Sequence, residues 1–291
     1  MSGIRPRSLG CNPPRARALG PQRRTDTDAG RTIPIASVPN LRDVGGLATA
    51  DGRPVRIGLL FRSAALDGLG VADEAAFARL GVRTIFDFRT DAERAERPDR
   101  VPAGVTHIVA DVLEEMAGNK PGQIMETMRN PATARQAFGD GKGVAMFVDQ
   151  YRNFVRLDSA RRAFGRAFGS VIDERSRPVL IHCTGGKDRT GWAAAALQLM
   201  LGVSAELVMA DYLASNEHLR PGFESYFADF EASGGDPEVL GSFLWVRPEY
   251  LEAALDEMRR SYATVEGYFA VGLGLGDQGL DDLRAAFLGA S

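Results

Sequence analysis

One stretch, residues 177–202, constrains the fold of this chain more than any other. It begins with an apolar run, Val179-Leu180-Ile181, which is typical of a buried strand. It ends in an Ala- and Leu-rich segment that favours a helix, whose start is marked by Thr190 and Gly191. A short polar loop with two glycines lies between them. This order predicts an anion-binding site, because backbone N–H groups converge on the loop and the helix dipole adds positive potential.

Two side chains at the ends of this loop, residues 183–189 (the cysteine loop), indicate what the anion site does. Cys183 opens the loop, where positive potential favours its thiolate form. Arg189 closes it, and its planar guanidinium suits two oxygens of a phosphate group. These features favour attack of the sulfur on a phosphate ester, whereas the alternative is that Cys183 is a small buried side chain of the core. The residues expected to bind phosphate are Thr184, Gly185, Gly186, Lys187, Asp188 and Arg189.

The string His182-Cys-Thr-Gly-Gly-Lys-Asp-Arg-Thr-Gly191 resembles the phosphate-binding loop of the cysteine-dependent protein tyrosine phosphatase superfamily. Its second half is similar to the bacterial tyrosine and lipid phosphatase branch of that superfamily. The runs Asn-Leu-Arg-Asp-Val-Gly-Gly (40–46), Phe-Arg-Ser (61–63) and Asp-Tyr-Leu-Ala-Ser-Asn (211–216) resemble the same branch. The resemblance implies a phosphatase with an α/β fold, in which helices flank a central, mainly parallel sheet and a helical insertion forms a lid.

The order of the predicted elements supports an α/β fold independently. Expected strands at 58–63, 82–88 and 106–110 alternate with short helices from Asp73 to Leu80 and after Arg89. This rhythm predicts a mainly parallel sheet. Ligands of such sheets gather at the carboxyl ends of the strands, so we expect the cysteine loop, residues 87–89 and Asp111 to share one edge.

The second half of the chain is mainly helical by pattern. Residues 146–172 predict two helices broken near residues 157–159, with an aromatic stripe that we expect in the core. Pro221 and the turn at 234–237 are expected to separate further helices. The other expected helices span 205–213, 245–262 and 281–288.

We expect two regions in the chain: a disordered basic tail over residues 1–32 and a single phosphatase domain over 33–291. The tail is rich in Arg, Pro and Gly and has no acidic residue before Asp26. Within the domain, the pattern weakens around 112–145, where methionines stand among Gly, Pro and charged residues. We interpret this region as a mobile lid, or alternatively as a long surface loop with one amphipathic helix.

Composition excludes several classes of protein. The formal net charge of −3 and the ordinary charged content of 25% give no sign of a nucleic-acid partner. No apolar run is long enough to span a membrane, and the tail lacks the apolar segment of a signal peptide. Two cysteines, one of them in the tail, do not make a disulfide framework. We therefore expect a cytoplasmic protein, or one secreted without a recognisable signal, with a phosphorylated protein or phosphoinositide as its partner.

Two carboxyl groups are candidates for the general acid of the predicted reaction. Asp188 lies inside the loop, and Asp111 follows a strand just before the predicted lid. Either carboxyl suits protonation of the leaving oxygen; we favour Asp188, although it also suits a structural ion pair with Arg189. Thr190 is placed to hydrogen-bond Cys183 and assist its departure. His182 orients the loop or is a structural polar neighbour.

We expect no cofactor and no metal, because Arg189 and the loop amides supply the positive charge that a phosphate needs. The histidines at positions 107, 182 and 218 look too scattered to form a metal cluster. Lys187 adds a second cation. By resemblance to lipid-active members of the family, it contacts a further phosphate of a phosphoinositide; the alternative is that it faces solvent.

Three residues of the N-terminal part, Arg42, Asp43 and Arg62, are interpreted as supporting residues. They form either an ion network that braces the cysteine loop or a cluster of surface salt bridges. Two other functions use part of the same motif. A rhodanese-type sulfurtransferase also places a cysteine between strand and helix, and a non-catalytic module binds phosphate without turnover. The Arg-Thr-Gly ending argues against the first, and the presence of both Cys183 and Arg189 argues against the second.

Overall fold

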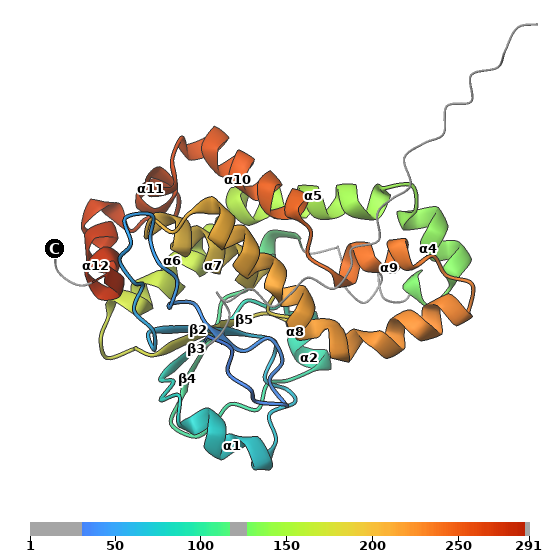
Figure 1. Ribbon diagram of the computed structural model, residues 1–291, viewed down its shortest axis with the longest axis horizontal. Coiled ribbons are helices and arrows are strands. Elements are labelled where there is room, and N and C mark those ends of the chain that lie inside the picture. Colours follow the sequence, from blue (N-terminus) through green and yellow to red (C-terminus); the bar gives the residue numbers. More distant parts are fainter. Residues whose placement is uncertain (1–30, 117–126, 289–291) are drawn as a thin grey trace, which may run out of the picture.

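The structure is a computed structural model that describes residues 31–116 and 127–288 (Figure 1). Within these residues, one five-stranded sheet has the strand order β1-β2-β5-β3-β4. β1 is antiparallel to β2, whereas β2, β5, β3 and β4 run parallel to one another. The mainly parallel sheet predicted from the sequence is thus confirmed. The strands are β1 (Arg42–Asp43), β2 (Leu60–Ser63), β3 (Thr84–Asp87), β4 (Thr106–Val109) and β5 (Val179–His182).

Helices cover both faces of the sheet, with most of them on one side (Figure 1). In chain order, the helices begin with α1 (Val71–Ala78), α2 (Asp91–Glu96), α4 (Pro131–Phe138), α5 (Lys142–Arg156), α6 (Asp158–Ile172), α7 (Arg189–Met200), α8 (Ala205–Ala232) and α9 (Pro237–Leu244). Further along follow α10 (Pro248–Tyr262), α11 (Val265–Gly267) and α12 (Gly276–Leu288). Short turns of helix, η2 (Glu114–Met116) and η3 (Tyr268–Gly272), join some of these elements.

The alternation of side chains along each strand divides the core into two layers. Phe86 and Ile181 point into the larger apolar cluster, which includes α5, α6, α7, α8, α10 and α12. Phe61 and Ile85 point the other way, into a smaller cluster with Phe77 of α1. Because successive residues of a strand face opposite sides of a sheet, strands buried on both faces are apolar throughout. This explains the continuous apolar run that precedes the cysteine loop.

The predicted break between two helices near residue 157 is confirmed. Leu157 has an extended backbone (φ −65°, ψ 137°) and separates α5 from α6. The aromatic stripe belongs to the core, since Tyr151, Phe154, Phe164 and Phe168 are all buried. These four side chains belong to the larger apolar cluster, so they pack α5 and α6 together with residues of the sheet.

The expected end of a helix at Pro221 is wrong, because α8 runs through this residue to Ala232. Proline removes one backbone donor but does not stop a helix that tertiary contacts hold on both sides. Here, Phe227 beyond the proline stacks on Trp245 with ring centroids 5.1 Å apart, and Phe230 is buried. The contacts of the second half of α8 therefore outweigh the local preference.

The folded part of the chain includes two residues that we assigned to the tail. Arg31 is buried, forms an ion pair with Asp211 at 3.0 Å and donates a hydrogen bond to the carbonyl of Gly45. Thr32 forms an isolated bridge with Arg42. The ordered fold therefore extends back at least to Arg31, because this guanidinium pairs with the buried carboxylate of Asp211. Residues 1–30 of the predicted tail lie outside the described residues.

The predicted lid region, 112–145, contains η2, α4 and the first residues of α5, while residues 117–126 lie outside the described part. α4 packs with the second half of α8 and with α9 around a small apolar cluster, separate from the two core layers. This cluster comprises Met128, Ala134, Phe230, Val239 and Leu240. Among the described helices, none has the length and apolar character required to span a membrane.

Candidate active site

The cysteine loop lies at the carboxyl edge of the sheet, as predicted. β5 ends at His182, whose neighbours in register are Ser63 of β2 and Asp87 of β3, and α7 begins at Arg189. The loop therefore passes directly from the centre of the sheet into a helix N-terminus. The first backbone N–H groups of a helix have no acceptor within the helix. The side chain of Cys183 is buried, with 1% of the residue exposed.

The guanidinium of Arg189 is fixed by a carboxylate that the sequence analysis missed. Nη1 lies 2.7 Å from Oε2 of Glu93, and Nη2 lies 2.6 Å from Oε1. Thr184 of the loop donates its hydroxyl to the same Oε1. Burial alone would raise the pKa of Glu93, but the ion pair and hydrogen bonds with Arg189 and Thr184 hold this pKa well below its usual range. Glu93 is therefore ionised and orients both ends of the loop.

Glu93 reaches the loop because of how α2 begins. Thr90 is the N-cap of this helix, and Glu93 occupies the third helical position. The Thr90 backbone N–H donates to Glu93 Oε2 at 2.9 Å, and the Thr90 hydroxyl accepts from the Glu93 N–H at 3.4 Å. This reciprocal pair is a capping box, which the spacing Thr-x-x-Glu signals in a sequence. The same spacing identifies Glu93 as a residue at the start of a helix, but it does not reveal Arg189 as its partner.

The side chains of Lys187 and Asp188, both from the cysteine loop, pair with each other. Lys187 Nζ lies 2.8 Å from Asp188 Oδ2, and it also donates to the Phe243 carbonyl at the end of α9. Asp188 accepts a further hydrogen bond from the hydroxyl of Tyr151 at 2.9 Å. Tyr151 in turn accepts from Tyr212 at 2.7 Å. Lys187 is 6% exposed, so in this structure it does not face solvent.

Asp111 and Thr190, the other two candidates for the reaction, are near the loop but make no direct contact with Cys183 among the interactions of the described residues. Asp111 is partly buried and accepts the backbone N–H of Leu113 at 2.8 Å. Burial raises its pKa, against the opposing influence of that hydrogen bond and of Arg189. The hydroxyl of Thr190 is buried and has no hydrogen-bond partner within residues 31–116 and 127–288.

Arg62 and Arg42 form a buried ion network next to the loop. Arg62 donates to the Gly186 carbonyl at 2.8 Å, and Arg42 forms an ion pair with Asp211 at 2.7 Å. Arg31 and Arg62 also approach Asp211, at 3.0 and 3.4 Å. Burial and the neighbouring Arg42 lower the pKa of Arg62 to about 10, while Asp211 and Cys183 oppose the change. The network is internal, so the interpretation of a surface cluster is wrong for these two arginines.

The carboxylate of Asp43 binds backbone groups rather than the arginines of this network. Its oxygens accept the backbone N–H groups of Gly45 at 2.8 Å and Gly58 at 2.6 Å. The pKa of Asp43 is raised by burial, with these two hydrogen bonds acting in the opposite direction. Asp43 therefore shapes the turn before β2. The residue that pairs with the arginines is Asp211, from the run at 211–216.

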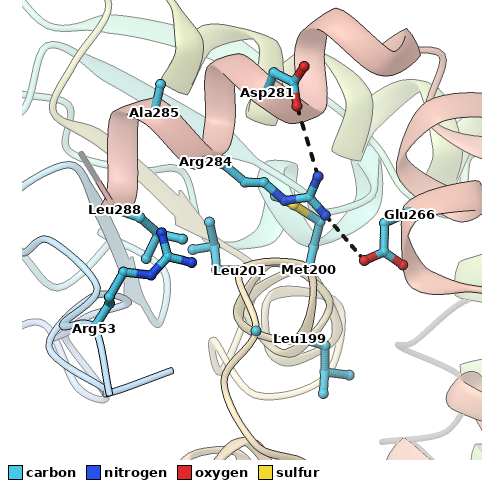
Figure 2. Close-up of a pocket in the computed structure, with 10 residues that line it drawn as sticks. Arg53, Leu199, Met200, Leu201, Glu266, Asp281, Arg284, Ala285 and Leu288 are labelled. Atoms are coloured by element: carbon cyan, nitrogen blue, oxygen red, sulfur yellow. Dashed lines mark hydrogen bonds and ion pairs between the residues drawn. The ribbon is translucent and has the colours of Figure 1, made fainter. Parts of the chain in front are cut away.

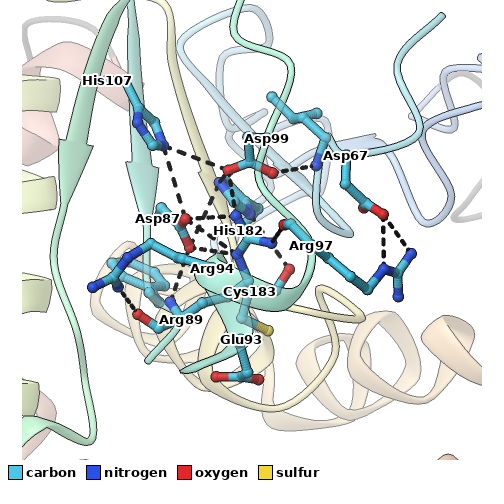
Figure 3. A network of polar contacts seen from close by, with 12 residues as sticks. Asp67, Asp87, Arg89, Glu93, Arg94, Arg97, Asp99, His107, His182 and Cys183 are labelled. Atoms are coloured by element: carbon cyan, nitrogen blue, oxygen red, sulfur yellow. Dashed lines mark hydrogen bonds and ion pairs between the residues drawn. The ribbon is translucent and has the colours of Figure 1, made fainter. Parts of the chain in front are cut away.

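A second polar network lies behind the loop (Figure 3). His182 and His107 contact the same oxygen of Asp99, at 3.2 and 3.5 Å, so the expectation that the histidines are scattered is wrong for these two. With Asp87 they place four ligand atoms within 4.8 Å of one another. The guanidinium of Arg89 lies 2.6 Å from Asp99 and 2.8 Å from Asp87. Arg89 therefore supplies positive charge next to both carboxylates.

This second network also contacts the cysteine loop. His182 is fully buried, and its Nδ1 lies 3.4 Å from the Cys183 carbonyl oxygen. Burial alone would raise the pKa of Asp99, but contacts with His107, His182 and Arg89 hold this pKa well below its usual range. The network places an ionised carboxylate against the histidine that precedes Cys183.

A cavity of about 440 Å³ lies away from the loop, between the end of α7 and α12 (Figure 2). Arg284 crosses it toward Glu266 and Asp281, and Arg53 lies at its rim (Figure 2). None of its lining residues belongs to the cysteine loop. The chemistry described above therefore has no connection with this cavity.

The mainly parallel sheet, with a cysteine loop that leads from its middle strand into α7, has the arrangement of a tyrosine phosphatase. The sequence matches the tyrosine phosphatase family over residues 33–289, and the chain belongs to this family. It is therefore a protein tyrosine phosphatase, which sets aside both the sulfurtransferase and the non-catalytic module.

Individual relatives agree with the family match. The chain is similar to the triple specificity protein phosphatase PtpB of Mycobacterium tuberculosis, with 30% identity over 274 residues, 86% of this chain and 96% of the relative. A relative from Cupriavidus necator is 31% identical over 233 residues, 80% of each chain. A tyrosine-protein phosphatase of Nostoc commune is 28% identical over 229 residues, 77% of this chain and 72% of the relative. The resemblance predicted from the loop is confirmed.

Proposed function

We propose that the chain hydrolyses phosphotyrosine, and related phosphate monoesters, through a cysteinyl-phosphate intermediate on Cys183. The observation that carries this proposal is that two buried guanidinium groups flank the cysteine loop. Arg189 closes the loop at the start of α7, and Arg62 donates to the Gly186 carbonyl at 2.8 Å; each is held in place by a carboxylate, Glu93 or Asp211. Positive groups fixed in advance favour a thiolate and stabilise the charge that develops on the transferred phosphoryl group.

The reaction has two steps. In the first, the Cys183 thiolate attacks phosphorus, the S–P bond forms, and the bond from phosphorus to the ester oxygen breaks while a carboxylic acid gives that oxygen its proton. In the second, water attacks phosphorus, loses a proton to the same carboxylate, and the S–P bond breaks to restore the thiolate. Arg189 and the loop amides hold the equatorial oxygens in both steps. Thr190, whose hydroxyl is buried without a partner in the described chain, supports the departing thiolate.

Asp188 is our choice for the general acid, with Asp111 as the alternative. Asp188 belongs to the loop itself, and the hydroxyl of Tyr151 fixes one of its oxygens. Its pairing with Lys187 must loosen before it holds a proton. Asp111 differs from Asp188 in both respects. Burial raises the pKa of Asp111, but no described side chain positions it against Cys183.

The range of substrates follows from Lys187. The relative PtpB is named a triple specificity phosphatase, which supports activity on more than one kind of phosphate ester. To contact a second phosphate of a phosphoinositide, Lys187 has to leave both Asp188 and the Phe243 carbonyl. Phosphotyrosine, which needs one phosphate contact, is therefore the substrate class that the geometry favours.

The single domain that we propose begins at Arg31, two residues before the start expected from the sequence, runs to residue 291 and carries a lid. Cys183 and Arg189 are 1% and 8% exposed, and this low exposure is what a lid over the loop would produce. The bond from Lys187 to Phe243 joins the loop to α9, which packs with α4 in the cluster around Val239. These contacts support a lid in which α4 acts together with α9.

The test is hydrolysis of para-nitrophenyl phosphate in the presence of EDTA, for the wild type and Cys183→Ser. We expect turnover that survives chelation and is abolished in the variant, because serine is a far weaker nucleophile in this position. Residual turnover of the variant near the wild-type rate contradicts the thiolate mechanism. Parallel assays with a phosphotyrosine peptide and a phosphoinositide rank the substrate classes.

A further inference from the structure

A residue outside the cysteine loop, Asn40, contacts two consecutive carbonyls of the loop. Its Nδ2 lies 3.1 Å from the Gly185 oxygen and 3.0 Å from the Gly186 oxygen. Asn40 is 3% exposed, and it precedes β1 by two residues. Neither the loop motif nor the ion network discussed above includes it.

Asn40 is one of three donors that hold this side of the loop. The backbone N–H of Ala65 donates to the Thr184 carbonyl at 3.1 Å, and Arg62 donates to the Gly186 carbonyl at 2.8 Å. Together with Asn40, these groups satisfy three successive carbonyls, those of residues 184, 185 and 186. Only Asn40 bridges two of them, and it is the sole described donor of this set to Gly185.

The direction of these carbonyls determines the direction of the loop amides. In a planar trans peptide, the C=O of one residue and the N–H of the next point in opposite directions. With the carbonyls of residues 184–186 turned outward to Ala65, Asn40 and Arg62, the N–H groups of residues 185–187 turn to the opposite side. Amides that point together in this way form the concave donor surface that binds an anion.

The loop has little freedom to adopt another orientation. Gly186 has φ +64°, and a Cβ atom added there would lie 2.1 Å from the Ser63 carbonyl oxygen. The loop is therefore pressed against the end of β2, where only glycine fits. The contact keeps the Gly186 carbonyl within reach of both Arg62 and Asn40.

Asn40 makes these bonds from a left-handed backbone conformation. Its φ is +58°, a region that asparagine tolerates better than most residues with a side chain. Its Oδ1 is buried and has no hydrogen-bond partner in the described part of the chain. A buried side chain with one unsatisfied polar atom persists where the surrounding structure uses its other polar atom. Here the group in use is the amide nitrogen.

We propose that Asn40 is a positioning residue that sets the phosphate-binding amides of the cysteine loop from outside, through the Gly185 and Gly186 carbonyls. This inference rests on the proposed function of the loop. Asn40 itself contacts neither Cys183 nor the substrate in this account. Its effect is to favour the thiolate and the bound phosphate by aligning the donors that both use.

The test uses two variants that separate the amide from the backbone. Asn40→Gly introduces a residue that adopts positive φ without steric cost, and it removes the side-chain donor. Asn40→Asp keeps the size but replaces the donor by a carboxylate facing two carbonyls. Ala263→Gly is the matched control, because it makes the same kind of change at φ +64° on an exposed residue far along the chain.

For each protein we would measure kcat and KM, the Kd of inorganic phosphate by titration calorimetry, and the rate of Cys183 alkylation by iodoacetamide from pH 4 to 9. We expect Asn40→Gly to lose at least about tenfold in kcat/KM and in phosphate affinity, with alkylation moved to higher pH, and Asn40→Asp to lose more. Ala263→Gly should match the wild type.

Asn40→Gly that folds, binds phosphate within twofold of the wild type and keeps its alkylation profile overturns the proposal, because a purely structural asparagine leaves these properties unchanged. Calorimetry and alkylation need no turnover. A wild type without phosphatase activity therefore counts against the proposed function, while the comparison of phosphate binding still decides the role of Asn40.

Discussion

Arg189 and Glu93 form a two-pronged ion pair between the start of α7 and the start of α2, with N–O distances of 2.6 and 2.7 Å. Parallel charge-assisted hydrogen bonds of this kind fix the plane of a guanidinium as well as its position. Since Glu93 engages Nη1 and Nη2 from one side, the orientation of Arg189 toward the loop is set before a substrate arrives. Glu93 is thus as much a part of the site as the loop motif.

Replacement of Glu93 by Gln should lower kcat/KM by about tenfold to a hundredfold, less than the loss of a direct transition-state donor, because Arg189 remains but is no longer held on both prongs. Steady-state kinetics with para-nitrophenyl phosphate measure the effect. Glu96→Gln, an exposed residue of the same helix, is the control and should leave the rate unchanged. A Glu93→Gln enzyme as active as this control contradicts the positioning role.

The same pair should make stability depend on pH. The pKa of Glu93 is depressed in the folded protein, so its contribution is fully present above the unfolded value of about 4.3 and is lost as the pH falls further. The wild type should exceed Glu93→Gln by about 3 kcal/mol in unfolding free energy at pH 6, since the pair is buried. Urea unfolding at pH 6 and pH 3.5 should show this difference shrinking at the lower pH; a constant difference would count against the ion pair.

Leaving groups of different basicity distinguish the two candidates for the general acid. A poor leaving group such as phenolate needs the proton, so loss of the acid should slow phenyl phosphate hydrolysis by about a hundredfold or more. Para-nitrophenolate leaves readily without a proton and should be affected far less. We expect this contrast for Asp188→Asn and not for Asp111→Asn; the reverse pattern would assign the role to Asp111.

Asp211 should be essential for stability, because three arginines share its carboxylate in a buried environment. Asp211→Asn leaves their mutual repulsion uncompensated and should destabilise the fold by about 3–5 kcal/mol. Urea unfolding at neutral pH measures the loss, and Asp229→Asn on the exposed side of α8 serves as the control. A change of less than about 1 kcal/mol would show that Asp211 is not the electrostatic centre of this network.

The features that could be predicted from sequence are those encoded locally. The run 179–202 predicted strand, loop and helix, because apolar residues, glycines and helix formers are contiguous there. The break near Leu157 and the parallel sheet followed from the same kind of periodicity. Each depends on neighbours in the chain, and each is confirmed.

The residues that support the loop could not be found in this way, since their partners are distant in sequence. Glu93 lies 96 positions before Arg189, and Asn40 lies 145 positions before Gly185. His107 and His182 come together only because β4 and β5 flank β3 in the sheet. The predicted end of a helix at Pro221 was wrong for the opposite reason. The packing of Phe227 on Trp245 outweighed the local helix-breaking preference of proline.

The central claim is that phosphate passes through Cys183, and the most direct test is to trap the intermediate. A reaction with a phosphorylated substrate, quenched rapidly in acid and digested, should yield the peptide containing Cys183 with one added phosphoryl group, detected by mass spectrometry. The account predicts this adduct in the wild type and its absence in Cys183→Ser. Turnover of the wild type with no phosphoryl group on Cys183 at any quench time, or with the group on another residue, would contradict it.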